Sequence, residues 1–139
     1  MSAPRYVLDA CAVIAFLAKE AGAEKVVDLL IGAAKGDLKL YIHRINLLEV
    51  YYDAYKAGGA DQADRVYQKM LNLPITIDSN LDGELFRKAG ALKATYRISL
   101  ADAIAISLAS QLNASLVTSD HHEFDTIEAV GYLSFEWIR

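Results

Sequence analysis

The segment that decides the fold is Tyr6-Val7-Leu8-Asp9-Ala10-Cys11-Ala12-Val13-Ile14-Ala15, near the start of the sequence. Residues 6–8 form a short apolar run that stops at Asp9, a pattern typical of a buried β-strand. Residues 10–17 are all small or apolar, and they predict a helix that is packed on several sides. A strand that passes directly into a helix opens a βα unit, so we expect an α/β fold.

The same alternation continues along the chain. Further strands are predicted at residues 38–42, 75–77, 115–118 and 132–137. Helices are predicted at residues 22–34, 45–57, 61–73, 81–96 and 99–112, and Gly58-Gly59 predicts a break between two of them. The helix over 99–112 is apolar almost all round, which is typical of a helix enclosed in the fold. Because strands separated by helices form parallel sheets, we expect a single three-layer α/β/α domain over residues 1–139, with a mainly parallel sheet of four to five strands.

Composition excludes several classes of protein. The chain has 139 residues, of which 54% are hydrophobic, so it can bury a core and is not expected to be disordered. Cys11 is the only cysteine, which excludes an intrachain disulfide framework. The surplus of 18 acids over 14 bases argues against a generally basic, nucleic-acid-coating surface. The sequence shows no targeting segment or membrane span, so we expect a soluble, cytoplasmic protein with no membrane partner.

Four carboxylates occupy positions that a parallel sheet brings together. Asp9 and Asp120 follow the first and fourth predicted strands, whereas Glu49 and Asp102 lie in the first turns of predicted helices. The loops after parallel strands and the N-termini of the helices that follow share one edge of the sheet, where ligands bind in such folds. The sequence therefore predicts an acidic cluster at this edge.

Each acid also has an ordinary structural explanation. Asp9 is placed to cap the helix that follows it, and Asp120 to form an Asx turn. The patterns Ser99-Leu-Ala-Asp102 and Asn46-Leu-Leu-Glu49 match the capping box. Four clustered carboxylates, however, repel one another unless a cation compensates them, and an all-oxygen cluster favours Mg²⁺ or Mn²⁺. The chemistry that fits such a centre is metal-assisted hydrolysis of a phosphodiester.

These segments resemble a known family. The run that ends at Asp9, together with Asn46-Leu-Leu-Glu49, Ser99-Leu-Ala-Asp102-Ala and Val117-Thr-Ser-Asp120, is similar to the motifs of the PIN-domain nucleases, and most similar to the VapC-like toxins of toxin–antitoxin pairs. The resemblance implies a Rossmann-like sheet and a Mg²⁺- or Mn²⁺-dependent endoribonuclease that acts on RNA. It also implies a cognate antitoxin partner and a homodimer.

The resemblance assigns roles residue by residue. Asp9, Glu49, Asp102 and Asp120 are the implied catalytic acids, and Asp9, Asp102 and Asp120 the implied metal ligands. Thr118 matches a position where the family often carries a hydroxyl near the site. Cys11 is a departure, because the family usually has Ser or Thr there and a thiol is a poorer hydrogen-bonding group. This departure leaves open a catalytically weak PIN-like module that binds RNA or protein.

Several other polar and aromatic residues have simpler structural explanations. His121 and His122 lack the further ligands of a zinc site and are expected to be exposed loop residues, and Asp125 is either a fifth acid of the site or a residue at a loop or helix start. Two further groups of residues have either a structural role or a role in binding a partner. Core packing or an antitoxin-binding groove explains Tyr51, Tyr52 and Tyr55. A solvated surface or contacts with RNA phosphates explain the basic residues Arg87, Lys88, Lys93 and Arg97.

Two other enzyme classes are disfavoured by the residues after the first strand. A phosphatase with Asp9 as covalent nucleophile resembles the haloacid-dehalogenase-like enzymes, but those carry a second Asp where this chain has Cys11. A dinucleotide-binding enzyme needs a Gly-x-Gly-x-x-Gly turn at this point, and the sequence has none there.

Overall fold

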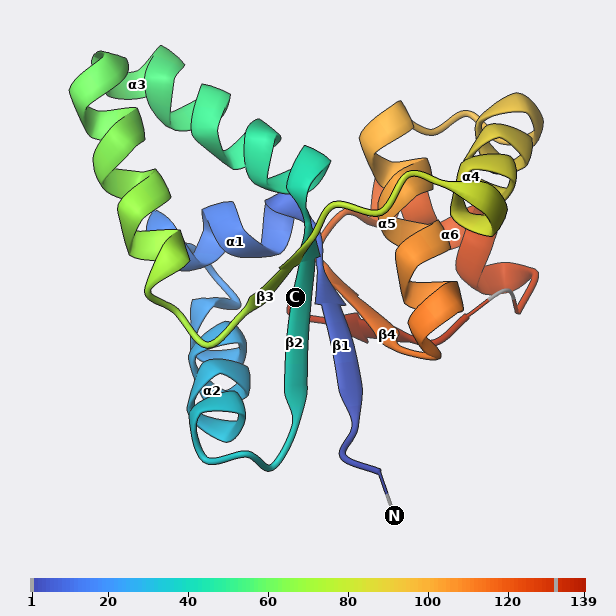
Figure 1. The fold of residues 1–139 in the computed structure, drawn as a ribbon, viewed down its shortest axis with the longest axis horizontal. Coiled ribbons are helices and arrows are strands. Elements are labelled where there is room, and N and C mark those ends of the chain that lie inside the picture. The colour runs from blue at the N-terminus through green and yellow to red at the C-terminus, as the bar shows by residue number, and fades with distance from the viewer. Residues whose placement is uncertain (1, 132) are drawn as a thin grey trace.

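The structure, a computed structural model, describes residues 2–131 and 133–139 as a parallel sheet with helices on both sides (Figure 1). The strands are β1 (Arg5–Leu8), β2 (Lys39–His43), β3 (Thr76–Asp78), β4 (Ser115–Thr118) and β5 (Phe135–Trp137). The helices are α1 (Ala10–Leu17), α2 (Ala23–Ala34), α3 (Arg44–Leu71), α4 (Gly83–Thr95), α5 (Leu100–Leu112) and α6 (His121–Ala129). The predicted α/β class and the parallel sheet are therefore confirmed.

The register of the sheet brings distant segments to one edge. The strand order is β3-β2-β1-β4-β5, and all neighbouring pairs are parallel. Leu8 at the end of β1 is paired with Ile42 on β2 and with Val117 on β4. The residues that come next on the three strands, Asp9, His43 and Thr118, consequently emerge at the same level.

The core lies on both faces of this sheet. Successive strand residues point to opposite faces, so Val7 and Leu116 pack with α4, α5 and α6, whereas Leu8 and Val117 pack with α1, α2 and α3. Helix α5 is buried over nearly its whole circumference, as its sequence predicts. The first turn of α5, which carries Asp102, is thus fixed by the core beneath it.

Three local features differ from, or sharpen, the expectations. Helix α6 was not predicted, because only Phe124 and Ile127 form its buried stripe and this pattern is too short to recognise. The break at Gly58-Gly59 is confirmed as a kink inside α3, where Gly59 has a φ of 85° that residues with a Cβ rarely adopt. The C-terminal strand begins at Phe135, later than predicted, and residue 132 lies outside the described residues. None of the helices over the described residues combines the length and the apolar character needed to cross a membrane.

Candidate metal centre

Asp9 is held at the edge of the sheet by two hydrogen bonds. It is the N-cap of α1 and is 1% exposed. One carboxylate oxygen accepts from the backbone N–H of Ala12 at 2.8 Å, and the other accepts from the Thr118 hydroxyl at 2.5 Å. Asp9 therefore caps α1, as its position in the sequence predicts, and also accepts a hydrogen bond from the end of β4.

Thr118 connects the first and fourth strand ends. Its Oγ1 donates to Asp9 and also accepts from the backbone N–H of Asp120 at 3.0 Å. Asp120 in turn caps α6, and its Oδ1 accepts from the N–H of Glu123 at 3.1 Å. The structural role of Asp120 is therefore that of a helix cap, where the sequence predicts an Asx turn. One hydroxyl places two of the predicted site acids relative to each other.

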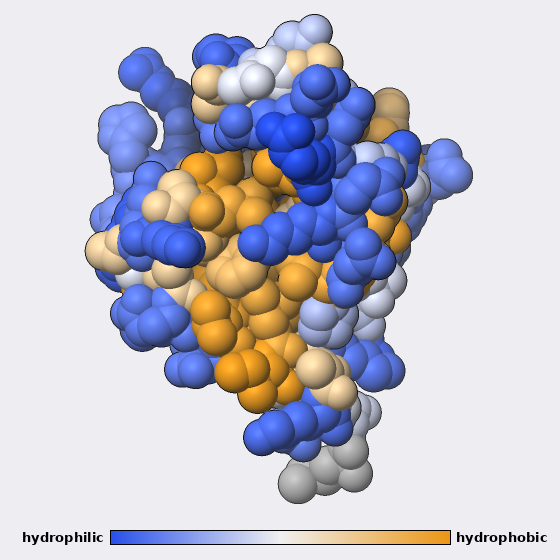
Figure 2. All heavy atoms as spheres, turned by 90° about the vertical axis from the view of Figure 1, so that its left-hand side faces the viewer, coloured by the Kyte–Doolittle hydropathy of each residue, from blue (hydrophilic) through white to orange (hydrophobic). Residues whose placement is uncertain are grey.

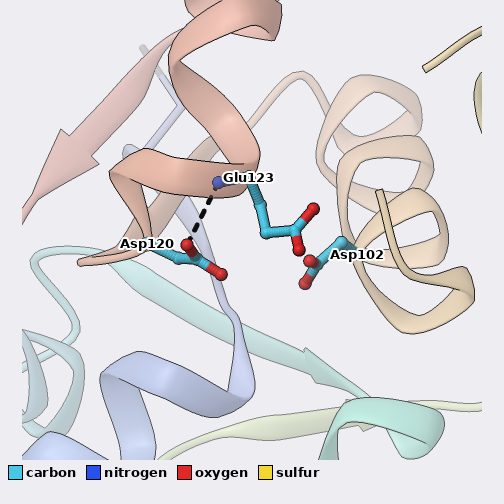
Figure 3. Close-up of side chains that lie close together, drawn as sticks. All are labelled: Asp102, Asp120 and Glu123. Atoms are coloured by element: carbon cyan, nitrogen blue, oxygen red, sulfur yellow. Dashed lines mark hydrogen bonds between the residues drawn. The ribbon is translucent and has the colours of Figure 1, made fainter. Parts of the chain in front are cut away.

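Asp102 lies in the first turn of α5, a different helix from those that Asp9 and Asp120 cap. Ser99 caps this helix and accepts from the N–H of Asp102 at 3.0 Å, as expected for that pattern. Carboxylate oxygens of Asp102, Asp120 and Glu123 all lie within 4.8 Å of one another. In Figure 3 the side chains of Asp102 and Glu123 point toward each other from separate helices, with Asp120 beside them.

Glu123 is a site residue that sequence reasoning missed. It lies one helical turn after Asp120, so its position depends on α6, which was not predicted. Its Oε2 is buried and has no hydrogen-bond partner among the described residues. Asp125, the residue considered as a fifth acid, instead pairs with His121 at 2.8 Å on the exposed surface of the same helix.

Glu49 lies on α3 and is half-buried. Burial raises the pKa of Glu49, and a hydrogen bond from the Tyr52 hydroxyl, at 3.4 Å, lowers it in part. The charge of Glu49 raises the pKa values of Asp9 and Asp102, so it contributes to the same electrostatic cluster, although its carboxylate is not among the three that meet within 4.8 Å. The Asn46-x-x-Glu49 pattern is not a capping box, because α3 begins earlier and is capped by His43.

Burial, together with neighbouring acids, raises the pKa values of Asp9 and Asp102. Burial raises the pKa of Asp9 to about 7, opposed by its bonds to Thr118 and Ala12 and reinforced by the charges of Asp120 and Glu49. The pKa of Asp102 is also raised to about 7, first by burial and then by the charge of Asp9, with a hydrogen bond to Ser99 acting in the other direction. No lysine or arginine of the described chain is among the groups that shift these two values. A cation at this position would stabilise the ionised forms.

The donor set fits a hard divalent cation. Asp102, Asp120 and Glu123 offer only oxygen atoms, and the partnerless Oε2 of Glu123 is a free buried ligand atom. Mg²⁺ and Mn²⁺ prefer such carboxylate oxygens and usually keep several waters. The converging group contains two of the three implied metal ligands, Asp102 and Asp120, together with Glu123, whereas the third, Asp9, is not part of it.

Cys11 lies in the first turn of α1, with its side chain still in contact with solvent. Burial and then the charges of Asp9, Asp120, Asp102 and Glu49 raise the pKa of its thiol to about 12. The thiol is thus neutral near pH 7 and faces the acids as a weak hydrogen-bonding group.

The two histidines after Asp120 are exposed, as expected, but they begin a helix. The His121 ring stacks on Trp137 with centroids 3.7 Å apart, and its Nδ1 and Nε2 lie 2.8 Å from Asp125 and 2.9 Å from the Arg139 carbonyl oxygen. The acceptor carbonyl of Arg139 and then Asp125 raise the pKa of His121. These contacts fasten α6 to β5 and the residues after it, and they explain His121 without a zinc ion.

Fold and site together define a parallel α/β domain with an acidic centre at the carboxyl edge of its sheet. A family model described as PIN domain matches residues 6–130. The chain therefore belongs to the PIN-domain family.

Solved structures with the same fold come from VapBC toxin–antitoxin systems. A DNA-bound VapBC structure from Salmonella typhimurium matches with a TM-score of 0.74 and 16% identity, covering 98% of this chain and 99% of that one. VapBC2 from Rickettsia felis, bound to a promoter DNA fragment, matches with a TM-score of 0.71 and 21% identity, over 96% and 98% of the two chains. VapC20 from Mycobacterium tuberculosis, described as a toxin that cleaves the sarcin-ricin loop, matches with a TM-score of 0.62 and 12% identity, over 81% and 86%. Among curated protein sequences, no match was found.

Proposed function

We propose that this protein is a Mg²⁺- or Mn²⁺-dependent endoribonuclease and the toxin of a toxin–antitoxin pair. The observation that carries the proposal is the meeting of Asp102, Asp120 and Glu123 within 4.8 Å, beside the buried carboxylate of Asp9. The PIN family and the VapBC neighbours support the same function. We place its action in the cytoplasm, where a ribonuclease toxin meets its substrate.

The roles of the acids follow from how each is held. Asp102, Asp120 and Glu123 are the residues that would hold the ion, because their oxygens converge. The bound ion supplies a Lewis acid for the scissile phosphate and lowers the pKa of an attacking water. Asp9, fixed by Ala12 and Thr118, orients the cluster and adds a fourth negative charge. Glu49 lies outside the three converging carboxylates, and its charge acts on Asp9 and Asp102, so we assign it the role of accepting the proton of the water.

Cleavage of a labelled single-stranded RNA tests this function. Wild-type protein is expected to cut the RNA with Mg²⁺ or Mn²⁺ and not with EDTA. Asp102→Asn and Asp120→Asn should reduce cleavage by at least about 100-fold, because each removes one ligand charge. Asp125→Asn is the matched control, since this acid pairs with His121 on the exposed surface and should keep full activity. Equal cleavage by the wild type and both site variants would contradict the proposal.

A catalytically weak module that binds RNA or protein is the second candidate. Cys11 favours it, since a neutral thiol lies among the acids where the family usually carries a hydroxyl. Cys11→Ser distinguishes the two. An active nuclease limited by this residue should gain cleavage in the Ser variant, whereas a binding module should show no metal-dependent cleavage in either form.

An antitoxin is the proposed protein partner. Helices α1, α2 and α3 lie on one side of Figure 1, and that side, seen face on in Figure 2, carries a broad apolar surface. Val27, Ile31 and Leu71 are exposed on these helices, and a hollow of about 480 Å³ between α1 and α3 is lined in part by Leu17 and Val66. The tyrosines singled out as partner candidates lie farther along: Tyr51 lines a separate groove of about 460 Å³, and Tyr52 and Tyr55 are about half exposed.

A homodimer and RNA contacts complete the proposal. We expect two copies to pair, which light scattering of the purified protein tests directly. Arg87, Lys93 and Arg97 are exposed on and just after α4, where they are available to RNA phosphates. Lys88 on the same helix donates to the Ser110 hydroxyl at 2.7 Å, so part of the predicted basic run has a structural role.

A further inference from the structure

Asn46 connects the two helices that carry Glu49 and Asp102. It lies on α3, three residues before Glu49, and its side chain is fully buried at 0% exposure. Its Nδ2 donates to the carbonyl oxygen of Ala101 at 3.3 Å, and Ala101 immediately precedes Asp102 on α5. Residues three apart on a helix share a face, so the amide and the Glu49 carboxylate belong to the same side of α3.

The orientation of this amide is determined by its neighbour. A carbonyl oxygen accepts but cannot donate, so the NH₂ group of Asn46 must face Ala101. The Oδ1 is left buried, with no partner among the described residues. A buried acceptor without a donor lowers stability, and leucine has nearly the same size with no polar atom to bury. Packing alone therefore favours an apolar side chain at this position.

Ser107 provides a contrast within the same core. It is also fully buried, on α5, but its hydroxyl donates to the Ala103 carbonyl at 2.8 Å, within its own helix. That bond satisfies Ser107 locally and connects no two elements. Asn46 differs in both respects, because it bridges two helices and leaves one of its own atoms unsatisfied.

We propose that Asn46 is a positioning residue of the metal centre, which holds the Glu49 turn of α3 against the first turn of α5 and so sets the separation of Glu49 from Asp102. The inference rests on the proposed function, because the spacing of the two acids has a role only when they serve one metal-dependent site. Asn46 acts through these acids and does not itself contact the substrate.

The experiment measures Mn²⁺ affinity by calorimetry and the thermal midpoint of the metal-free protein. Asn46→Leu should bind Mn²⁺ about tenfold or more weakly, as substitutions behind metal ligands do, while its midpoint equals or exceeds that of the wild type. Asn46→Ala should weaken Mn²⁺ binding by the same factor. It should also lower the thermal midpoint, because the smaller side chain leaves a cavity. Ser107→Ala is the matched control and should keep wild-type Mn²⁺ affinity.

Each alternative outcome is decisive. Wild-type Mn²⁺ affinity in a folded Asn46→Leu variant would overturn the inference. A loss of affinity that is seen only in variants with a lowered thermal midpoint would also overturn it, because general destabilisation would then explain the loss. If the Leu variant does not fold, the Ala variant decides in the same way through its own affinity. A wild-type protein that binds no Mn²⁺ would overturn the proposed function together with this inference, whereas normal wild-type binding beside unaffected variants overturns the inference alone.

Discussion

The acids at the strand ends and the acids carried by helices are held in different ways. Asp9 and Asp120 follow β1 and β4. The Thr118 hydroxyl donates to the Asp9 carboxylate and accepts from the backbone N–H of Asp120, so the pairing of β1 with β4 fixes both acids. Asp102 and Glu49 depend on how α5 and α3, which cover opposite faces of the sheet, pack against each other, with Asn46 as a polar link between the helices. Strand-end acids are thus set by backbone pairing, and helix-borne acids by side-chain packing.

Replacing the buried strand-end acid should have the largest effect. Asp9→Asn is expected to reduce metal-dependent cleavage by at least about 100-fold, because the substitution removes a charge from the centre. At pH 8 the same variant should unfold at a higher temperature than the metal-free wild type, since it removes a carboxylate whose ionisation is opposed by burial. RNA cleavage and thermal unfolding measure the two effects.

The control for the stability effect of Asp9→Asn is the same unfolding measurement at a lower pH. Because the pKa of Asp9 rises from 3.8 to about 7 on folding, the native state holds the proton more tightly than the unfolded state. Stability of the metal-free wild type should therefore fall as the pH rises from about 4 to 7, and the gain from Asp9→Asn should vanish near pH 4. A gain that is the same at both pH values would contradict this explanation.

Metal binding should release protons from one strand-end acid, Asp9, and one helix-borne acid, Asp102. Asp9 and Asp102 both have pKa values of about 7 without metal, so the centre must lose protons to bind a cation. Mn²⁺ affinity should rise about tenfold or more between pH 6 and pH 8 and level off above it. Calorimetry in two buffers of different ionisation enthalpy should show proton release at pH 6.5, and an affinity independent of pH would argue against these shifts.

Thr118→Val tests the link between the strand ends. The variant leaves one Asp9 oxygen and the Asp120 N–H without the hydroxyl, and it should weaken Mn²⁺ binding by about tenfold. It should also lower stability by about 1–3 kcal/mol in denaturant unfolding, because buried groups are left unpaired. Thr126→Val, at an exposed position on α6, is the matched control and should change neither quantity.

Tyr52→Phe tests a helix-borne acid and should have the smallest effect. Removal of the hydroxyl takes away the one interaction that lowers the pKa of Glu49, so the acidic limb of the cleavage profile should move to higher pH. The 3.4 Å bond is weak, and we expect about a twofold loss at pH 7. Tyr55→Phe is the control, and an unchanged pH profile in Tyr52→Phe would remove Tyr52 from the site.

The sequence predicts the strand-end part of the site better than the helical part. Short apolar runs identify β1 and β4, and the acid after each run must lie at the sheet edge whatever the helices do. Glu123 was missed because its place depends on α6, whose buried stripe contains only Phe124 and Ile127. Its approach to Asp102 is also a contact between two helices, which no local pattern encodes.

The sequence also predicts the wrong start for α3. The Asn46-x-x-Glu49 spacing satisfies the local rule for a capping box, but the cap is His43, whose Nδ1 accepts from the N–H of Ile45 at 3.0 Å. Histidine is not among the preferred capping residues, so the helix start moves back along the chain without a signal in the pattern. The outcome places Asn46 inside the helix and inside the core, where local rules no longer describe it.

The crowding of like charges at the sheet edge has a kinetic consequence. Without a cation, the carboxylates of Asp102, Asp120 and Glu123 converge within 4.8 Å, and their local negative field opposes the approach of a phosphate. RNA association should therefore be slow until the ion is bound, so the faster route is expected to be metal first and then RNA. Stopped-flow mixing should show fast RNA capture by protein pre-equilibrated with Mn²⁺, and a lag when Mn²⁺ arrives together with the RNA.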